Sequence, residues 1–332
     1  MRSNLLRNIV LYFCASACLL AAGWYGHDLY RILAYGEKKV RRIKAAGYRL
    51  TSPLLDIELP EGLNINQEPI NFRYKVDNFV KQVVDGTRVQ KVSVYYRDMG
   101  DGPWFSINEN QEFNPASMMK VAIMIAWLKR TEANADTLKQ TFLFDGAGVD
   151  MTSGQTTKPR HTLEAGHRYT VETLLEYMMS YSDNNATSLL LNNVPSAELM
   201  AVVKGMGITQ NPNGERNSIT AHNYSGFFRI LYNASFLNRD LSERALQLLS
   251  KEDFPQGIYA GVPKGVTVAS KFGEFVDENS NQLHEFGIVY HPKGAYVIGI
   301  MTKGNDFAFQ TSVIRDISAL IYREVDAGAI LH

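Results

Sequence analysis

The chain has 332 residues, of which 45% are hydrophobic and 20% are charged, which is the composition of an ordinary globular protein with a large core or two lobes. Lys and Arg together number 34, as do Asp and Glu, so the net charge at neutral pH is zero. This balance gives no indication of a nucleic-acid-binding surface or an acidic tail, and we expect no nucleic-acid partner.

The first 26 residues differ from the rest of the chain. Residues 9–26 carry no charge and are largely apolar, and Arg2 and Arg7 precede them. A run of this length is near the lower limit for crossing a bilayer, and a basic start followed by an apolar run is also the pattern of a secretory signal. We expect residues 1–26 to be a membrane anchor or signal segment, with the rest of the chain outside the cytoplasmic membrane, in the periplasm or at the cell surface.

A basic cluster at residues 38–44 favours the opposite orientation, because positive residues tend to stay on the cytoplasmic side. We still expect export, because Arg7 lies almost against the apolar run whereas the cluster begins well after it. Cys14 and Cys18, the only cysteines, lie inside that run. The rest of the chain can therefore form no disulfide and offers no thiol ligand for a metal.

The elements after a connector at residues 27–69 follow from periodicity and turn residues. Apolar residues at helical spacing predict a helix at about 70–85, and β-branched and aromatic residues predict strands at 89–97 and 104–107. Apolar stripes predict a helical middle, and the end returns to strands and a last helix. The remaining expected elements are helices at 121–128, 171–178, 189–191, 199–203, 227–232 and 241–249, strands at 266–272, 285–291 and 296–302, and a helix at 307–325.

This order of two strands, many helices, three strands and a helix predicts an α/β (α+β) fold. We expect one mixed or antiparallel sheet of five strands, built from both ends of the chain and flanked by helices, with an inserted all-helical lobe at about residues 108–255. A cleft between the sheet and the lobe is where a site would be expected.

The pair Ser117 and Lys120 is the first candidate for chemistry. If Ser117 opens a helix, Lys120 lies one turn further along on the same face. A serine hydroxyl is a weak nucleophile until a base takes its proton, and a partly desolvated lysine can be that base. Taken alone the pair is a weak signal, because most Ser-x-x-Lys pairs lie on solvated helix surfaces.

Two further motifs follow in order. A Ser-Asp-Asn sequence at residues 182–184 lies between two predicted helices, and a Lys-Phe-Gly sequence at 271–273 lies on the first of the late strands. The three motifs together resemble those of the active-site-serine penicillin-recognising enzymes, which comprise class A β-lactamases and the related penicillin-binding D-alanyl peptidases. The resemblance covers about residues 70–326, which we expect to form one β-lactamase-like domain.

The resemblance implies catalytic roles for three residues. Ser117 would attack a carbonyl group and form an acyl-enzyme, and Lys120 would take its proton if burial and the nearby Lys271 lower its pKa. Ser182 would relay a proton to the leaving nitrogen. No metal or cofactor is implied, because the seven histidines show no metal-binding spacing.

The resemblance also implies substrate-binding roles on two elements. Asn184 would hydrogen-bond the substrate amide and Lys120, and Lys271 would draw in a substrate carboxylate. Gly273 and Glu274 follow on the same strand, and the backbone N–H groups of Glu274 and Ser117 would form the oxyanion hole.

Two residues depart from the family pattern. The family usually has Thr or Ser at Phe272, whose ring cannot donate a hydrogen bond to a substrate carboxylate. Glu274 stands where the family has a small residue. Two alternatives stay open for its carboxylate, which either repels an anionic substrate or points away or pairs with a cation.

The apparatus for deacylation is not evident. Class A β-lactamases carry a loop glutamate that activates the deacylating water, ahead of a Thr-rich helix start. Residues 218–220 resemble that helix start, but the span 204–217 before them is too short for the family's loop. We expect Glu215, the only carboxylate of this span, to lie on the surface.

Three functions remain open on the sequence alone. The first is β-lactam hydrolysis through an acyl-enzyme, and the second is D-alanyl-D-alanine carboxypeptidase or peptidase activity on peptidoglycan stem peptides. The third is a non-catalytic penicillin-binding or scaffolding domain. We expect a monomer whose partners are a small β-lactam or stem peptide and, through the N-terminal segment, the membrane.

Overall fold

The structure is a computed structural model that describes residues 48–52, 72–100, 103–147, 150–153, 155–205, 218–276 and 280–328. The predicted membrane segment at 1–26 and most of the connector at 27–69 lie outside these residues. Within the described ranges, no helix combines the length and the apolar character that a membrane crossing requires.

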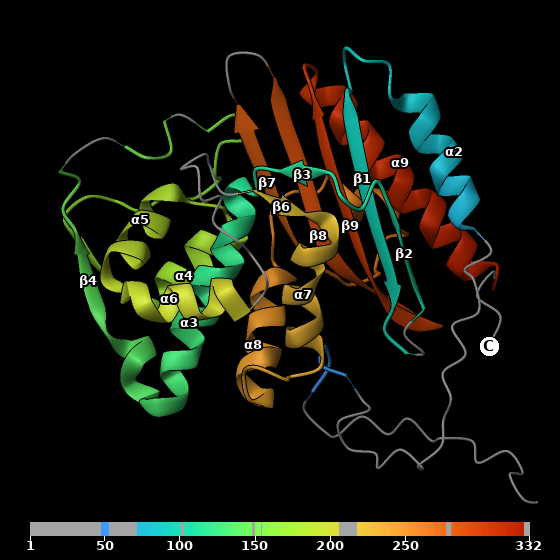
Figure 1. The fold of residues 1–332 in the computed structure, drawn as a ribbon. Helices are drawn as coiled ribbons and strands as arrows, with labels where there is room; N and C mark the ends of the chain where they lie inside the picture. Colours follow the sequence, from blue (N-terminus) through green and yellow to red (C-terminus); the bar gives the residue numbers. More distant parts are fainter. Residues whose placement is uncertain are drawn as a thin grey trace, which may run out of the picture. The chain divides into compact units, whose positions relative to one another are not determined.

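A five-stranded sheet forms the centre of the described fold (Figure 1). Its strands lie in the order β2-β1-β9-β8-β7, and every neighbouring pair is antiparallel, so the sheet is antiparallel rather than mixed. The first two strands come from the start of the domain and the other three from its end, which confirms the predicted construction. The strands are β1 (Lys91–Asp98), β2 (Trp104–Ile107), β7 (Val268–Val276), β8 (Asn281–His291) and β9 (Gly294–Gly304).

Two helices cover one face of the sheet, α2 (Arg73–Val83) and α9 (Phe307–Asp326), and they lie side by side (Figure 1). Val76 and Val80 are buried at helical spacing on α2, and Ile317 and Ile321 are buried in the same way on α9. Each such side chain contributes roughly 1.5–3 kcal/mol when it is fully removed from water. These stripes explain why both ends of the domain meet on this face.

The helical lobe lies at the other face of the sheet (Figure 1). Its central helix is α3 (Lys120–Ala133), in which every residue from 120 to 128 is buried, and a helix that is buried all round must be surrounded by others. Helices α7 and α8 also contact the sheet and so join it to the lobe. The surrounding helices are α4 (Val171–Ser180), α5 (Asn184–Asn193), α6 (Ser196–Gly205), α7 (Ala221–Tyr232) and α8 (Arg239–Leu249).

Two small sheets and three short 3₁₀ helices were not predicted. These strands of two to four residues are too short for an alternating pattern to be visible in the sequence, and they form by pairing with a partner elsewhere in the chain. The unpredicted elements are the pairs β3 (Glu112–Phe113) with β6 (Ile219–Thr220) and β4 (Thr141–Phe144) with β5 (His167–Thr170), and the 3₁₀ helices η2 (Ala116–Met119), η3 (Ala135–Lys139) and η4 (Ile258–Gly261).

Candidate active site

Ser117 lies in the 3₁₀ turn η2, which runs directly into α3, so Lys120 follows it at the start of the helix as predicted. The turn is held in an uncommon backbone conformation, because Ala116 has a φ of 50°. A non-glycine residue in this region carries strain that the surroundings must maintain. The side-chain oxygen of Asn114 accepts the Ala116 N–H at 2.9 Å and so stabilises the strained turn.

Buried polar side chains anchor this turn to the rest of the domain. The Tyr224 hydroxyl of α7 donates to the Met118 carbonyl oxygen at 2.8 Å, and His284 Nε2 lies 3.0 Å from the Asn114 carbonyl oxygen. Burial lowers the pKa of His284 to about 4, so its ring is neutral at neutral pH. The Thr302 N–H donates to His284 Nδ1 at 3.2 Å, which assigns the ring proton to Nε2.

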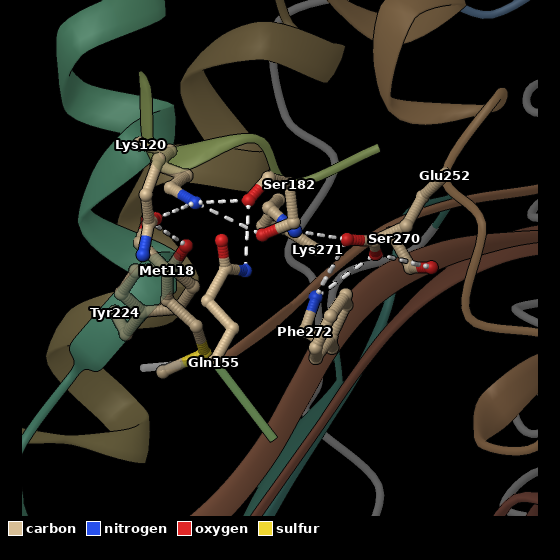
Figure 2. A network of polar contacts seen from close by, with 10 residues as sticks. Met118, Lys120, Gln155, Ser182, Tyr224, Glu252, Ser270, Lys271 and Phe272 are labelled. Atoms are coloured by element: carbon tan, nitrogen blue, oxygen red, sulfur yellow. Dashed lines mark hydrogen bonds and ion pairs between the residues drawn. The ribbon is translucent and has the colours of Figure 1, made fainter. Parts of the chain in front are cut away.

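Lys120 is buried, and its amine contacts the Ser-Asp-Asn turn (Figure 2). Lys120 Nζ lies 2.8 Å from the Ser182 carbonyl oxygen, 3.0 Å from the Ser182 hydroxyl and 2.7 Å from Asn184 Oδ1. Burial lowers the pKa of Lys120 well below its usual value, and the positive charge of Lys271 lowers it further. Both effects favour the neutral amine, whose lone pair can take a proton.

The Ser-Asp-Asn turn connects α4 to α5, as its motif predicted. Asp183 is fully buried and caps α5, because its carboxylate accepts the N–H groups of Asn185 at 2.6 Å and Ala186 at 3.2 Å. The same carboxylate accepts the Leu163 N–H at 2.9 Å. Ser182 has a φ of 57°, so a second strained residue lies at the site. Asp183 therefore holds the turn that presents Ser182.

A polar segment between β4 and β5 packs against this turn, and no pattern in the sequence predicted this contact. Gln155 Nε2 donates to the Ser182 carbonyl oxygen at 3.1 Å, and Asn184 Nδ2 donates to the Met151 carbonyl oxygen at 3.1 Å. The side-chain amide oxygen of Gln155, Oε1, is buried and has no hydrogen-bond partner among the described residues. These residues lie in a turn-rich stretch without periodicity, so only the folded structure reveals their place.

Strand β7 brings its Lys-Phe-Gly sequence beside the turn η2, which carries Ser117. A Cβ atom built on Gly273 would lie 2.8 Å from the Pro115 carbonyl oxygen and 3.0 Å from the Met118 backbone nitrogen. Real Cβ atoms do not approach backbone this closely, so glycine is what allows the strand and the turn to touch. Gly273 therefore allows the turn that carries Ser117 to lie against the edge of the strand.

Lys271 and Phe272 have partners that the sequence did not indicate. The Lys271 ammonium group is fully buried and forms an ion pair with Glu252, which follows α8. Burial raises the pKa of Glu252 to about 7, against the opposing effect of Lys271. Phe272 turns away into the core under α9, where its ring stacks on that of Phe254 with centroids 4.5 Å apart.

Glu274 binds a neighbouring loop. Its carboxylate accepts the backbone N–H groups of Thr156 at 2.7 Å and Thr157 at 2.9 Å, and the Thr157 hydroxyl at 2.7 Å. Of the two alternatives that the sequence left open, neither describes this arrangement fully, because the carboxylate is held by uncharged donors. The negative charge nevertheless acts on Lys120 and opposes the lowering of its pKa.

The span 204–217, which is too short for the family's loop and whose Glu215 we expect on the surface, lies largely outside the described residues, which omit 206–217. The helix start predicted at 218–220 is present, since the Thr220 side chain accepts the Asn223 N–H at 3.2 Å and caps α7. In the ranges that the structure covers, no group of three or more His, Cys, Asp or Glu side chains could hold a metal ion.

Solved structures with this fold are numerous. A β-lactamase from Sphaerobacter thermophilus is 22% identical with a TM-score of 0.65, and the match covers 76% of this chain and 97% of that one. PBP-A is 20% identical with a TM-score of 0.65, covering 79% and 98% of the two chains. A class A β-lactamase from Mycobacterium abscessus is 20% identical with a TM-score of 0.65, covering 76% and 99%. At these identities the likeness shows the fold alone.

The sequence itself matches one family model. No curated protein matches the chain. The model of the β-lactamase enzyme family matches residues 75–325, which is well over half of the chain and includes all three motifs. The chain therefore belongs to the β-lactamase enzyme family.

Proposed function

We propose that the chain is an active-site-serine hydrolase that opens β-lactams through an acyl-enzyme on Ser117. The observation that carries this proposal is the buried amine of Lys120, whose pKa is lowered and which contacts both Ser182 and Asn184 at the start of the Ser117 helix. A neutral amine in this position is the base that a serine nucleophile needs.

Acylation follows from this arrangement. The neutral Lys120 amine takes the Ser117 hydroxyl proton while Ser117 Oγ attacks the lactam carbonyl carbon. The carbonyl oxygen becomes an oxyanion, which the backbone N–H groups of Ser117 and Glu274 would stabilise. Lys271 supports this step electrostatically, since its charge favours the unprotonated amine of Lys120.

Collapse of the tetrahedral intermediate breaks the carbon–nitrogen bond. The Lys120 ammonium group returns a proton to the Ser182 hydroxyl, 3.0 Å away, as Ser182 gives its own proton to the leaving nitrogen. Asn184, whose Oδ1 lies 2.7 Å from Lys120 Nζ, would also hydrogen-bond the substrate amide. Hydrolysis is completed when water attacks the ester carbonyl carbon, the bond from that carbon to Ser117 Oγ breaks, and the proton that the water loses passes to Ser117 Oγ.

The second candidate is a D-alanyl-D-alanine peptidase of peptidoglycan stem peptides, which acylates in the same way but releases β-lactams slowly. The likeness to PBP-A is compatible with it, because PBP-A matches this chain with the same TM-score as the β-lactamases and the fold therefore does not separate the two functions. A variant of PBP-A has been solved as an acyl-enzyme complex with penicillin G. That complex concerns PBP-A itself and supports only the acylation half of the proposal for this chain.

Nitrocefin turnover, followed together with the intact mass of the protein, separates these functions. Many turnovers per enzyme molecule support a β-lactamase. A stoichiometric burst followed by arrest, with the acyl mass retained, contradicts hydrolysis and supports the peptidase. If neither benzylpenicillin nor its methyl ester adds mass to the wild-type protein, the domain does not react as a serine acyl-enzyme and the non-catalytic alternative stands. Ser117→Ala is the matched control and should carry no adduct.

We also propose that residues 70–326 form the catalytic domain and that residues 1–26 attach it to the outer side of the cytoplasmic membrane. The support is the uncharged run at 9–26 and the arginines before it. Protease added to spheroplasts, in which the outer face of the cytoplasmic membrane is accessible, should remove the domain from the full-length protein. Protection of the domain in spheroplasts, with digestion only after lysis, would contradict this orientation.

A further inference from the structure

The ammonium group of Lys271 has a partner within the chain. The Lys271 side chain is 0% exposed and forms an ion pair with Glu252, whose side chain is 2% exposed (Figure 2). The family resemblance led us to expect that this ammonium group would draw in a substrate carboxylate. In the structure this ammonium group instead pairs with a carboxylate of the protein itself.

Glu252 also takes the polar groups that flank Lys271 on the strand. Strand β7 is the outermost strand of the sheet, so its outward N–H groups need partners from outside the sheet. The Phe272 N–H donates to the two oxygens of Glu252 at 3.1 and 2.9 Å, and the Ser270 hydroxyl donates at 3.3 Å. Charge-assisted donors of this kind are those that an incoming carboxylate would use.

Contacts on both sides hold Glu252 in this position. The backbone N–H of Asp253 donates to the Ser180 carbonyl oxygen at the end of α4, at 2.9 Å. The next residue, Phe254, stacks on Phe272 with an interplanar angle of 16°. The turn that carries Glu252 is thereby tied to the helical lobe and to β7, and displacing the carboxylate would break packing on both sides.

Phe272 completes the enclosure of the cation. Lys271 Nζ lies 4.2 Å from the centroid of the Phe272 ring, whose face attracts a positive charge. The ring replaces the hydroxyl that the family usually has there and offers no donor to an anion. The departure at Phe272 and the presence of Glu252 therefore both disfavour the binding of an anion beside Lys271.

The charges around the described site disfavour a further anion. Glu252 balances the positive charge of Lys271, and burial favours the neutral form of Lys120. Glu274 adds a negative charge on the same strand, and Asp183 adds a buried one beneath the Ser-Asp-Asn turn. A carboxylate brought next to Lys271 would either face Glu252 or force that buried residue to lose its partner, which is costly.

We propose that Glu252 occupies the anion subsite of this enzyme, and that its preferred acyl donors carry no carboxylate beside the bond that is broken. The inference rests on the proposed function, because it concerns which substrates acylate Ser117. A neutral lactam, amide or ester leaves the Glu252–Lys271 pair intact, whereas a free carboxylate competes with Glu252. The substrate class is thus amidated or esterified peptides and neutral lactams.

The test compares benzylpenicillin with its methyl ester, which differ only in the carboxylate. The rate of acylation of Ser117 is measured by intact mass for each compound and divided by its rate of alkaline hydrolysis, which corrects for intrinsic reactivity. We expect the wild-type protein to react at least about 10-fold faster with the ester on this scale, which is a difference of about 1.4 kcal/mol. This comparison needs no variant and so does not depend on whether one folds.

Glu252→Gln keeps the shape of the side chain but removes its charge, and it should shift the ratio at least about 10-fold toward the free acid because Lys271 becomes available. The matched control is Glu243→Gln, a buried glutamate of α8 that accepts the backbone N–H groups of residues 49–51 and should leave the ratio unchanged. Acylation that favours the free acid in the wild type, or an unchanged ratio in Glu252→Gln, would overturn the inference alone. Absence of an adduct from both compounds in both proteins would instead overturn the proposed function, and the inference with it.

Discussion

The amine of Lys120 lies within hydrogen-bond distance of both oxygens of Ser182, at 2.8 Å from the carbonyl oxygen and 3.0 Å from the hydroxyl. This relationship joins the helix that follows Ser117 to the Ser-Asp-Asn turn. The two residues are 62 positions apart in the sequence, and the buried contact is available only because α3 is the central helix of the lobe. The predictions below concern this junction and the groups that maintain it.

Replacing Lys120 by Met removes the base while keeping an unbranched side chain of similar length. Acylation of Ser117 should slow by about 10²–10⁴-fold, the range that a positioned proton acceptor typically contributes. In the wild type the rate should rise with pH as Lys120 loses its proton, and the midpoint should lie well below the usual lysine pKa because burial lowers it. Stopped acylation assays read by mass check both statements. A Lys120→Met protein that is folded by circular dichroism and acylates at the wild-type rate would contradict the role.

Replacing Gly273 by Ala tests the close approach of β7 to the turn that carries Ser117. The new Cβ atom would meet the Met118 backbone nitrogen at 3.0 Å and the Pro115 carbonyl oxygen at 2.8 Å, so the turn must shift. We expect acylation to fall by at least about 10-fold, since displacement of a nucleophile by a fraction of an ångström is costly. Gly205→Ala is the control, because a Cβ atom there meets nothing within 4 Å. Equal acylation rates for the two variants would count against this reading.

Asp183→Ala should lower both stability and activity. Loss of the cap and of a buried acceptor for three N–H groups should reduce the free energy of unfolding by about 1–3 kcal/mol. Acylation should also slow, because Ser182 and Asn184 lose their support. Asn238→Ala removes the cap of α8, where the side chain accepts the Leu241 N–H at 3.0 Å, and should cost about 0.5–2 kcal/mol without slowing acylation. Denaturant unfolding and mass-detected acylation measure the two effects, and a loss of activity that is equal in both variants would speak against a specific role.

Glu285 should make the protein less stable as the pH rises. Burial and the negative charge of Glu252 together raise its pKa to about 8, so the folded state holds a proton that the unfolded state releases near pH 4.5. This proton makes the free energy of unfolding fall with pH between these values, by at most about 1.4 kcal/mol per pH unit. Lys120 contributes the opposite slope, because burial lowers its pKa in the folded state, so the contribution of Glu285 is read as the difference between the wild type and Glu285→Gln.

The measurement is best made between pH 6.5 and 8. Below that range His284, whose pKa is lowered to about 4, contributes the opposite slope, because its unfolded form gains a proton first. Glu252, whose pKa is raised to about 7, contributes a change of unfolding free energy with pH of the same sign as that of Glu285. The charged or titratable groups that act on Glu252, or feel its charge, are Lys271, Glu285, Tyr224 and Lys120. Glu285→Gln should make the fall in the free energy of unfolding with pH less steep. An identical slope in this variant and the wild type would show that Glu285 does not hold the proton.

Periodicity and motif order were sufficient to predict the five-stranded sheet, the helical lobe and the placement of the three motifs. The stripe on α9 and the β-branched run in β1 are local patterns, and the start of α4 follows from the Thr170 cap, whose side chain accepts the Thr173 N–H at 3.1 Å. Local patterns of this kind survive folding because each element buries its own apolar face.

The partners of the site could not be predicted in the same way. Glu252 contacts Lys271 from a turn after α8 that has no motif, and Glu274 binds Thr157 across 117 positions. Polar contacts between distant irregular segments leave no periodic trace in a single sequence. The ion pair at Lys271 therefore emerges only when the end of α8 and the edge of β7 are brought together.

The most direct test of the central claim is the intact mass of the wild-type protein after exposure to benzylpenicillin and, separately, to its methyl ester. The account predicts the addition of one acyl group, located on Ser117 by peptide mapping, which Ser117→Ala abolishes and Lys120→Met slows by about 10²-fold or more. A folded wild-type protein that gains no mass from either compound, or that gains it at a residue other than Ser117, would contradict the account.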